Sequence, residues 1–199
     1  MLDRTIPFYN TILRCEKYDL KKIVLPEEYQ IVSYKSGFEK DWADLEFAAG
    51  DFESKREATE YFCSKYLSDG SDKDDLLFLV ESTGKVIGSC ISWTDDKNGV
   101  PVNSLHWLIV REDHQGKGLG RSLCIATMNR FYQKGCRPIY IHTQPWSWKA
   151  IMLYNSLGFR IQKTDTFSSY SNQYTEAMST LKNILSLEQY SILEEKAEK

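Results

Sequence analysis

A strand, a glycine-rich turn and a helix follow one another within residues 104–134, and this order constrains the fold more than any other part of the sequence. The segment SLHWLIV (104–110) is almost continuously apolar, which predicts a strand that is buried on both faces. Residues 118–134 carry apolar side chains at helical spacing, and PIYIHT (138–143) predicts a further strand. A strand–helix–strand order favours parallel pairing of the two strands, because parallel strands need a long crossover connection such as a helix.

The remaining periodic segments predict more strands and helices around this unit. We expect further strands at residues 29–34, 76–81, 85–93 and 159–164. We expect further helices at residues 38–52, from an S-x-x-E cap at Ser54 through Tyr66, at 148–157, and from Thr175 to about Leu187. A short connection makes the second and third of these strands a hairpin. The fold class is therefore α/β (α+β), with a central mixed β-sheet flanked by helices.

Three parts of the chain differ in their patterning. Residues 1–28 lack clear periodicity and contain two prolines, which predicts an N-terminal arm or short helix leading into a domain at 29–174. Residues 175–199 predict a helical C-terminal extension. No clear seventh strand follows residue 164, because TFSSYSNQY is polar and predicts a loop.

Charge and cysteine content exclude several classes of protein. With 25 Lys and Arg against 28 Asp and Glu, the net charge is −3, and no dense basic block points to nucleic-acid binding. The N-terminus has no signal-peptide core and no apolar run could span a bilayer, so we expect a cytoplasmic protein without membrane contact. The five cysteines show no C-x-x-C spacing, which argues against a disulfide framework and against a metal site.

The turn REDHQGKGLGRSL (111–123) matches only one of three glycine patterns that bind phosphate at the start of a helix. The dinucleotide fingerprint G-x-G-x-x-G needs glycine where the chain has Arg121 or Leu123. The P-loop G-x-x-x-x-G-K-[ST] needs glycine where the chain has Gln115. The pattern [RQ]-x-x-G-x-[GA] fits Gln115 to Gly120. Unpaired amides at a helix N-terminus attract anions, and glycine leaves room for a diphosphate against them.

This turn resembles the acetyl-CoA pyrophosphate loop of the GNAT superfamily of N-acetyltransferases. AIMLYNSLGF (150–159) resembles the second signature of that family, A-x-x-L-Y-x-x-x-G-F. The resemblance covers residues 76–164 well and 29–75 loosely. It implies a GNAT-like acyl-CoA N-acyltransferase fold and an enzyme that transfers acetyl from acetyl-CoA to a primary amine by direct attack in a ternary complex. The acceptor would be a small-molecule or peptide amine.

The resemblance also implies roles for individual residues. The pyrophosphate would be held by Gln115, Gly116, Lys117, Gly118, Leu119, Gly120 and Arg121. The backbone of Leu108, Ile109 and Val110 would pair with the pantetheine arm, where the fourth and fifth strands of the family splay apart. The Leu108 amide would polarise the thioester carbonyl. Tyr154 would protonate the leaving thiolate, although a tyrosine in a helix can also simply pack in the core. Ser147 stands where many relatives have an asparagine that contacts the cofactor.

The group that deprotonates the amine is less clearly marked. Some relatives use a glutamate early in the fourth strand, where this chain has Ser104. His106 lies two residues on and on the same strand face, so it is the candidate base, and a satisfied buried histidine is the alternative. Glu46 and Glu81 are weaker candidates.

The acceptor side is the least defined part of the expected site. Trp42, Glu46, Asp51 and Phe52 could form an aromatic and acidic lining for a cationic amine, together with the segment after Phe167. Trp146 and Trp148 could wall the site or pack in the core. Without a clear seventh strand, this side would be reshaped or completed by a second subunit, a homodimer. A non-catalytic acyl-CoA sensor on the same fold is the alternative function, and the failed glycine spacings disfavour an unrelated nucleotide binder.

Overall fold

A computed structural model describes residues 3–68 and 71–198 of the chain. The described chain divides into two compact units. The first unit contains Leu20–Ser92 and His106–Arg130, and the second contains the segment that ends at Asp19, Trp93–Leu105 and the chain from Phe131 onward.

Seven strands form one hydrogen-bonded sheet with the order β2-β3-β4-β5-β6-β1-β7. The strands are β1 (Thr11–Cys15), β2 (Tyr29–Ser33), β3 (Leu76–Glu81), β4 (Val86–Lys97), β5 (Val100–Val110), β6 (Ile139–Thr143) and β7 (Arg160–Ile161). The helices are α1 (Phe38–Ala49), α2 (Lys55–Tyr66), α3 (Leu119–Gln133), α4 (Trp148–Leu157), α5 (Tyr174–Ile184) and α6 (Leu187–Glu195). Antiparallel and parallel pairs occur together, so the expected mixed sheet with helices is confirmed.

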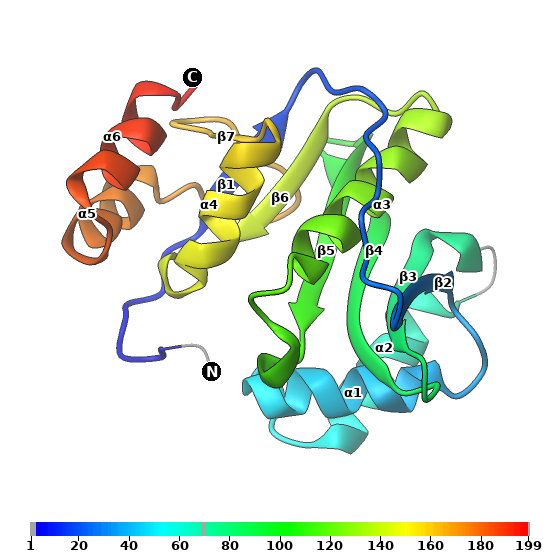
Figure 1. Cartoon of the computed structure of the whole chain (residues 1–199). Coiled ribbons are helices and arrows are strands. Elements are labelled where there is room, and N and C mark those ends of the chain that lie inside the picture. The colour runs from blue at the N-terminus through cyan, green and yellow to red at the C-terminus, as the bar shows by residue number, and fades with distance from the viewer. Residues whose placement is uncertain (1–2, 69–70, 199) are drawn as a thin grey trace. The chain divides into compact units, whose positions relative to one another are not determined.

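The first unit begins with an antiparallel ladder in which Tyr29 of β2 lies opposite Glu81 of β3. Helices α1 and α2 pack against each other in this unit (Figure 1). The expected cap at Ser54 is confirmed, because its hydroxyl accepts a hydrogen bond from the Glu57 amide at 3.1 Å. The return bond of the box reaches one residue further back, since the Glu57 carboxylate accepts from the Glu53 amide at 3.0 Å.

The second unit contains a strand that the sequence did not reveal. Strand β1 pairs antiparallel with both β6 and β7, and Leu13 lies opposite Ile141 on one side and Ile161 on the other. The segment expected as an arm therefore supplies the seventh strand that could not be found after residue 164. Ile12, Leu13 and Cys15 are fully buried, and a short strand buried on both faces shows no alternation from which it could be recognised.

The turn between β4 and β5 is tighter than the sequence suggested. We expected strands ending at residue 93 and starting at 104 with a longer turn between them, but only Asn98 and Gly99 separate the two strands. Both residues have positive φ angles, 56° and 83°, as a two-residue hairpin turn requires.

Further along, Asn103 and Ser104 of β5 pair in parallel with Ile139 and Tyr140 of β6, which confirms the expected parallel pairing.

The C-terminal part of the second unit is helical, but it holds two helices where one was expected. Helix α5 ends before Leu185, and a capping box between Ser186 and Gln189 starts α6. These helices pack on each other, and α6 also contacts α4 (Figure 1). The strand expected at 159–164 is shortened to β7. Across the described residues, no helix combines the length and apolarity needed to span a membrane.

Candidate active site

The glycine loop of the first unit lies between β5 and α3 and turns through two left-handed residues. Gly116 and Gly118 have φ angles of 79° and 77°, a conformation that other residues rarely adopt. A Cβ atom added at either glycine would meet no described atom within 4 Å. The glycines are therefore needed for the backbone conformation, and the additional clearance for a diphosphate remains a prediction.

The glycine loop leads directly into α3, and the first backbone amides of this helix point back toward the loop. The Ser122 amide donates to the Gly118 carbonyl at 3.1 Å, so the amides of Leu119 and Gly120 precede the hydrogen bonds of the first helical turn. Such amides, together with the positive end of the helix dipole, favour a bound anion.

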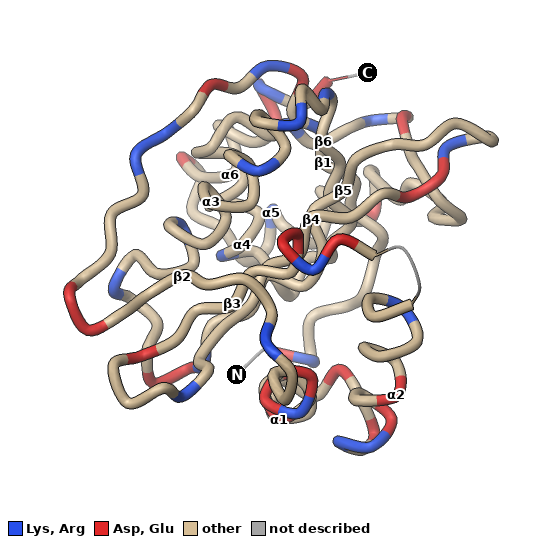
Figure 2. The backbone as a smooth tube through the Cα atoms, turned by 90° about the vertical axis from the view of Figure 1, so that its right-hand side faces the viewer, with Lys and Arg blue, Asp and Glu red and all other residues tan. Residues whose placement is uncertain are grey.

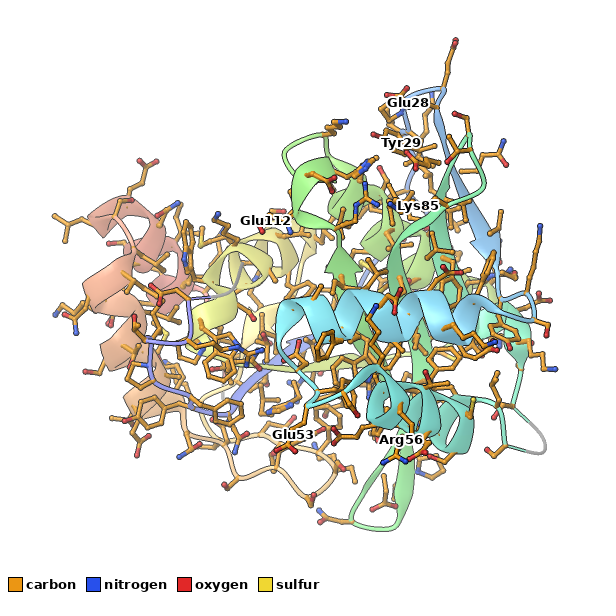
Figure 3. All side chains as sticks on the ribbon, turned by 90° about the horizontal axis from the view of Figure 1, so that it is seen from below. Glu28, Tyr29, Glu53, Arg56, Lys85 and Glu112 are labelled. Atoms are coloured by element: carbon orange, nitrogen blue, oxygen red, sulfur yellow. The ribbon has the colours of Figure 1, made fainter. Side chains whose placement is uncertain are left out.

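Gln115 has a structural role at the base of this loop. Its side-chain amide donates to the Val110 carbonyl at 2.8 Å, which ties the loop back to the end of β5. Gln115 therefore shapes the loop, and Lys117 gives the loop a positively charged side chain. The Lys117 ammonium donates to the hydroxyl of Tyr29, which lies at the start of β2 near Glu28 and Lys85 (Figure 3).

The part of β5 expected to hold the pantetheine arm departs from regular strand geometry. Trp107 has a φ angle of 51°, in the left-handed region that non-glycine residues avoid. Such a residue interrupts the alternation of a strand and re-aims the groups that follow it, here the Leu108 amide. The Trp107 carbonyl accepts a hydrogen bond from the Ser89 hydroxyl at 3.2 Å. A local distortion of this kind is common beside active sites.

Strand β4 passes very close to β5 at this point. A Cβ atom built on Gly88 would lie 2.6 Å from the Ile109 carbonyl oxygen and 3.3 Å from a methyl group of Val110. The Arg111 amide also donates to the Ile87 carbonyl at 2.8 Å. Glycine at position 88 thus fixes where the backbone of Ile109 runs.

His106, the candidate base, is half-buried and is held by a partner from α2. Its Nδ1 lies 2.9 Å from the Tyr66 hydroxyl, and the two rings meet edge to face with centroids 6.2 Å apart. Tyr66 is fully buried, so its hydroxyl is a fixed point for the imidazole. This pair could not be predicted from the sequence, because 40 residues separate its members.

The aromatic residues expected to line an acceptor site form a packed cluster in the first unit. Trp42 is fully buried, and its ring lies 5.7 Å from Phe52, 6.2 Å from Tyr61 and 5.3 Å from Trp107 between centroids. Phe52 and Trp107 are 5.6 Å apart and remain half-buried. Of this cluster, Trp42 belongs to the core, whereas Phe52 and Trp107 retain exposed surface.

Glu46 is the one acidic residue of the expected lining that is buried, with 2% of its surface exposed. Burial raises the pKa of Glu46 well above its ordinary value, and the neighbouring Asp51 carboxylate raises it further. Its Oε1 has no hydrogen-bond partner among the described residues. The other acidic residue of the expected lining, Asp51, is exposed, and further acidic residues lie along α1 (Figure 2).

The second unit holds Tyr154 and Ser147 on α4 and on the turn before it. Tyr154 is 5% exposed and its ring lies 5.9 Å from that of Phe159. The Ser147 hydroxyl accepts from the Gln144 side-chain amide at 2.9 Å. Trp146 lies under the N-terminal segment, with Phe8 edge-on at 5.2 Å and the Arg4 guanidinium 4.4 Å above its ring.

Ser104, which stands in place of the expected glutamate, is itself paired with a carboxylate. Its hydroxyl donates to Asp95 of β4 at 2.6 Å, within the second unit. Ser104 is fully buried and Asp95 is half-buried. A carboxyl group thus lies beside this position although the strand itself does not supply one.

A second polar cluster in the same unit was not anticipated from the sequence. Asp165 accepts hydrogen bonds from Lys97, from Arg14 at 2.5 Å and from the Tyr140 hydroxyl at 2.9 Å. Burial alone would raise the pKa of Asp165, but these three donors outweigh it and hold the pKa below its ordinary value. The cluster ties β1, β4 and β6 to the segment that follows β7.

Three comparisons relate this chain to known proteins. A model described as "Acetyltransferase (GNAT) family" matches residues 34–159. Mycothiol acetyltransferase from Acidothermus cellulolyticus is 27% identical over 162 residues, which are 73% of this chain and 49% of the relative, so the chain spans about half the length of that protein. A GCN5-related N-acetyltransferase from Sphaerobacter thermophilus aligns with a TM-score of 0.59 at 19% identity, over 76% of this chain and 48% of its own. Glucosamine-6-phosphate N-acetyltransferase from Arabidopsis thaliana aligns with a TM-score of 0.53 at 19% identity, over 74% of this chain and 99% of its own length. These structures confirm the expected fold.

Proposed function

The chain belongs to the acetyltransferase (GNAT) family. We therefore propose that it is an acyltransferase, which transfers acetyl from acetyl-CoA to a primary amine by direct attack in a ternary complex. The acceptor is a small-molecule or peptide amine. The observation that carries this proposal is the glycine loop, whose left-handed glycines lead into the N-terminus of α3 beside the charged Lys117.

The residues of the loop fit the diphosphate of coenzyme A. The amides of Gly116 to Gly120 and the Lys117 ammonium are the anion-binding groups, and Arg121 adds a second positive charge. The backbone of Leu108, Ile109 and Val110 is the proposed contact for the pantetheine arm, and Ser147 is a proposed polar contact. Bound acetyl-CoA supplies an activated acetyl thioester. That no metal takes part remains a prediction.

Two groups on the chain would act on the thioester. The Leu108 amide follows the distorted Trp107, and it is the proposed donor to the oxygen that gains negative charge. Tyr154 is the proposed acid for the departing thiolate, since a phenol with an ordinary pKa near 10 is protonated at neutral pH.

The proposed base is His106, and its contact with Tyr66 sets a condition on its protonation. A neutral imidazole can accept the amine proton on Nε2 only if Nδ1 carries the hydrogen, and the Tyr66 oxygen is then the acceptor for Nδ1. Asp95 is the competing candidate, because Ser104 brings its carboxylate beside the position where relatives carry glutamate. Glu46 is a poorer candidate than its raised pKa suggests, since only 2% of its surface is exposed to an incoming amine.

Two variants separate these candidate bases. His106→Gln keeps a side chain that can bond to Tyr66 but cannot take up a proton, and Asp95→Asn keeps the bond from Ser104. If His106 is the base, only the first variant loses about a hundredfold or more in kcat. If Asp95 is the base, only the second does.

A panel of amine acceptors, with released coenzyme A detected by a thiol reagent, tests the proposal as a whole. The panel combines small amines and peptide amines with the acceptor used by mycothiol acetyltransferases, since the curated relatives carry that name. A blank without acceptor is needed because Cys63 and Cys136 are only half-buried. Acetyl-CoA binding without turnover on any acceptor would favour the alternative, a non-catalytic acyl-CoA sensor. Absence of acetyl-CoA binding would refute both functions. A homodimer remains a prediction.

A further inference from the structure

Lys117, the cation of the glycine loop, is held by a tyrosine from a strand 88 residues earlier in the chain. Its Nζ donates to Tyr29 Oη at 2.8 Å and lies 5.4 Å from the centre of the tyrosine ring. Tyr29 is 5% exposed, whereas Lys117 is exposed. The hydrogen bond to Tyr29 raises the pKa of Lys117, and the nearby negative charges of Glu28 and Asp113 raise it further. The ammonium therefore keeps its charge while one buried oxygen sets its direction.

The hydrogen-bond roles around Tyr29 can be assigned from the donors available. His114 Nε2 lies 2.8 Å from Arg111 Nη2, and a guanidinium can only donate, so Nε2 accepts. His114 is then neutral with its hydrogen on Nδ1, which lies 3.1 Å from Tyr29 Oη and donates to it. The Tyr29 oxygen thus accepts two hydrogen bonds, one from His114 and one from Lys117.

Arg111 cannot take the role of Lys117 as the cation that binds a ligand, because its guanidinium is already engaged. Its guanidinium makes two bonds to the Asp113 carboxylate, at 2.6 and 2.9 Å, besides the bond to His114. An ammonium has three N–H groups, so the bond to Tyr29 leaves two that can reach a ligand. Arg111 and His114 therefore brace Tyr29, and Lys117 is the loop cation whose ammonium Tyr29 holds.

We propose that Tyr29 is a positioning residue for Lys117, which it aims at the diphosphate of acetyl-CoA, and that His114 fixes Tyr29 for this purpose. The inference rests on the proposed function of the loop. A lysine side chain loses much rotamer freedom when it is fixed, and Tyr29 removes part of that freedom before the ligand arrives. The brace thus strengthens binding of the diphosphate and leaves the chemistry of acetyl transfer unchanged.

The test compares a ligand that has the diphosphate with one that lacks it. Dissociation constants are measured by calorimetry for coenzyme A and for S-acetylpantetheine, in the wild type, Tyr29→Phe, Lys117→Met and the double variant. We expect Tyr29→Phe to weaken coenzyme A binding about fivefold, the effect of freeing part of one lysine's rotamers. In the Lys117→Met background the same change should have no further effect. In the Tyr29→Phe variant alone, binding of S-acetylpantetheine and the kcat with acetyl-CoA should stay within twofold of the wild type.

Lys85→Met is the matched control, since Lys85 is a lysine near Tyr29 that does not belong to the loop (Figure 3). It should leave coenzyme A binding within twofold of the wild type. Tyr29→Phe also leaves the buried His114 Nδ1–H without its acceptor, which lowers stability. His114→Phe is therefore a second variant that releases Tyr29 while keeping an aromatic ring against it, and it should show the same selectivity for coenzyme A.

Three results would overturn the inference. The first is unchanged coenzyme A binding in both Tyr29→Phe and His114→Phe. The second is an equal loss from Tyr29→Phe with and without Lys117. The third is an equal loss for S-acetylpantetheine, which would show a general structural effect. A wild-type protein that binds no coenzyme A would instead refute the proposed function together with this role.

Discussion

A single added methyl group at Gly88 should disturb the strand that is proposed to hold the pantetheine arm. In Gly88→Ala the new Cβ would lie 2.6 Å from the Ile109 carbonyl oxygen. Ordinary contact for such a pair begins near 3.4 Å, so the two atoms must separate by about 0.8 Å. The atom in the way belongs to the backbone, and no side-chain rotation can relieve the contact. Strand β5 must therefore shift at Ile109.

The size of the effect follows from the cost of overpacking a core, which is roughly 1–3 kcal/mol. For a chain of 199 residues, each kcal/mol lowers the melting temperature by about 2–4 °C. Gly88→Ala should therefore melt about 2–12 °C lower than the wild type. Because the shifted carbonyl belongs to Ile109, the KM for acetyl-CoA should rise as well.

Thermal melting and steady-state kinetics on the same preparation provide the assay. Gly84→Ala is the control, because Gly84 has a φ angle of 88° but no described atom within 4 Å of an added Cβ. Its strain should lower the melting temperature and leave the KM unchanged. A Gly88→Ala protein with the melting temperature and KM of the wild type would refute the idea that β4 fixes the path of Ile109.

Three further predictions concern Tyr154, Glu46 and Asp165. Tyr154→Phe keeps the ring against Phe159 and removes the proposed acid, so kcat should fall roughly a hundredfold with little change in KM for acetyl-CoA, and unchanged turnover would exclude this role. The pKa of Glu46 is raised in the folded state, so folding takes up a proton and the stability of the wild type should fall as the pH rises above about 4.5. Thermal melting measured against pH should show this fall in the wild type but not in Glu46→Gln. The pKa of Asp165 is lowered by its three donors, so its contribution is present above about pH 3.8 and is lost as the pH falls through the folded-state pKa. Asp165→Asn should therefore be about 1–3 kcal/mol less stable than the wild type at neutral pH in chemical denaturation, and the two proteins should converge in acid.

The local parts of the fold could be predicted because their signals are local. The cap at Ser54, the helix that follows the glycine loop and the parallel pairing of β5 with β6 depend on residues close together in the sequence. The Asn98–Gly99 turn also carries a local signal, since Asn-Gly is a strong hairpin dipeptide, but we expected a longer turn over DDKNGVPVN and that expectation was wrong.

Strand β1 could not be predicted, for a physical reason. A strand in the middle of a sheet is recognised by its neighbours, and those of β1 lie more than 120 residues further along the chain. Its five residues are buried on both faces except for Arg14, whose guanidinium reaches Asp165. Neither the apolar run nor the charged residue within it indicates a sheet position without the partners.

The same distinction separates the two kinds of residue at the candidate active site. Most of the groups that would touch acetyl-CoA lie between Leu108 and Arg121, where a strand, a turn and a helix follow one another, and their pattern is therefore visible in the sequence. The residues that hold these groups come from elsewhere: Tyr66 is 40 residues from His106, and Tyr29 is 88 residues from Lys117. Tyr66 and Tyr29 lie in a helix and a strand whose sequence patterns indicate only that these residues are buried, not which residues they contact. Substitutions at Tyr66 and Tyr29 consequently test the tertiary arrangement itself, whereas substitutions in the glycine loop test a pattern that any chain with the same local sequence would share.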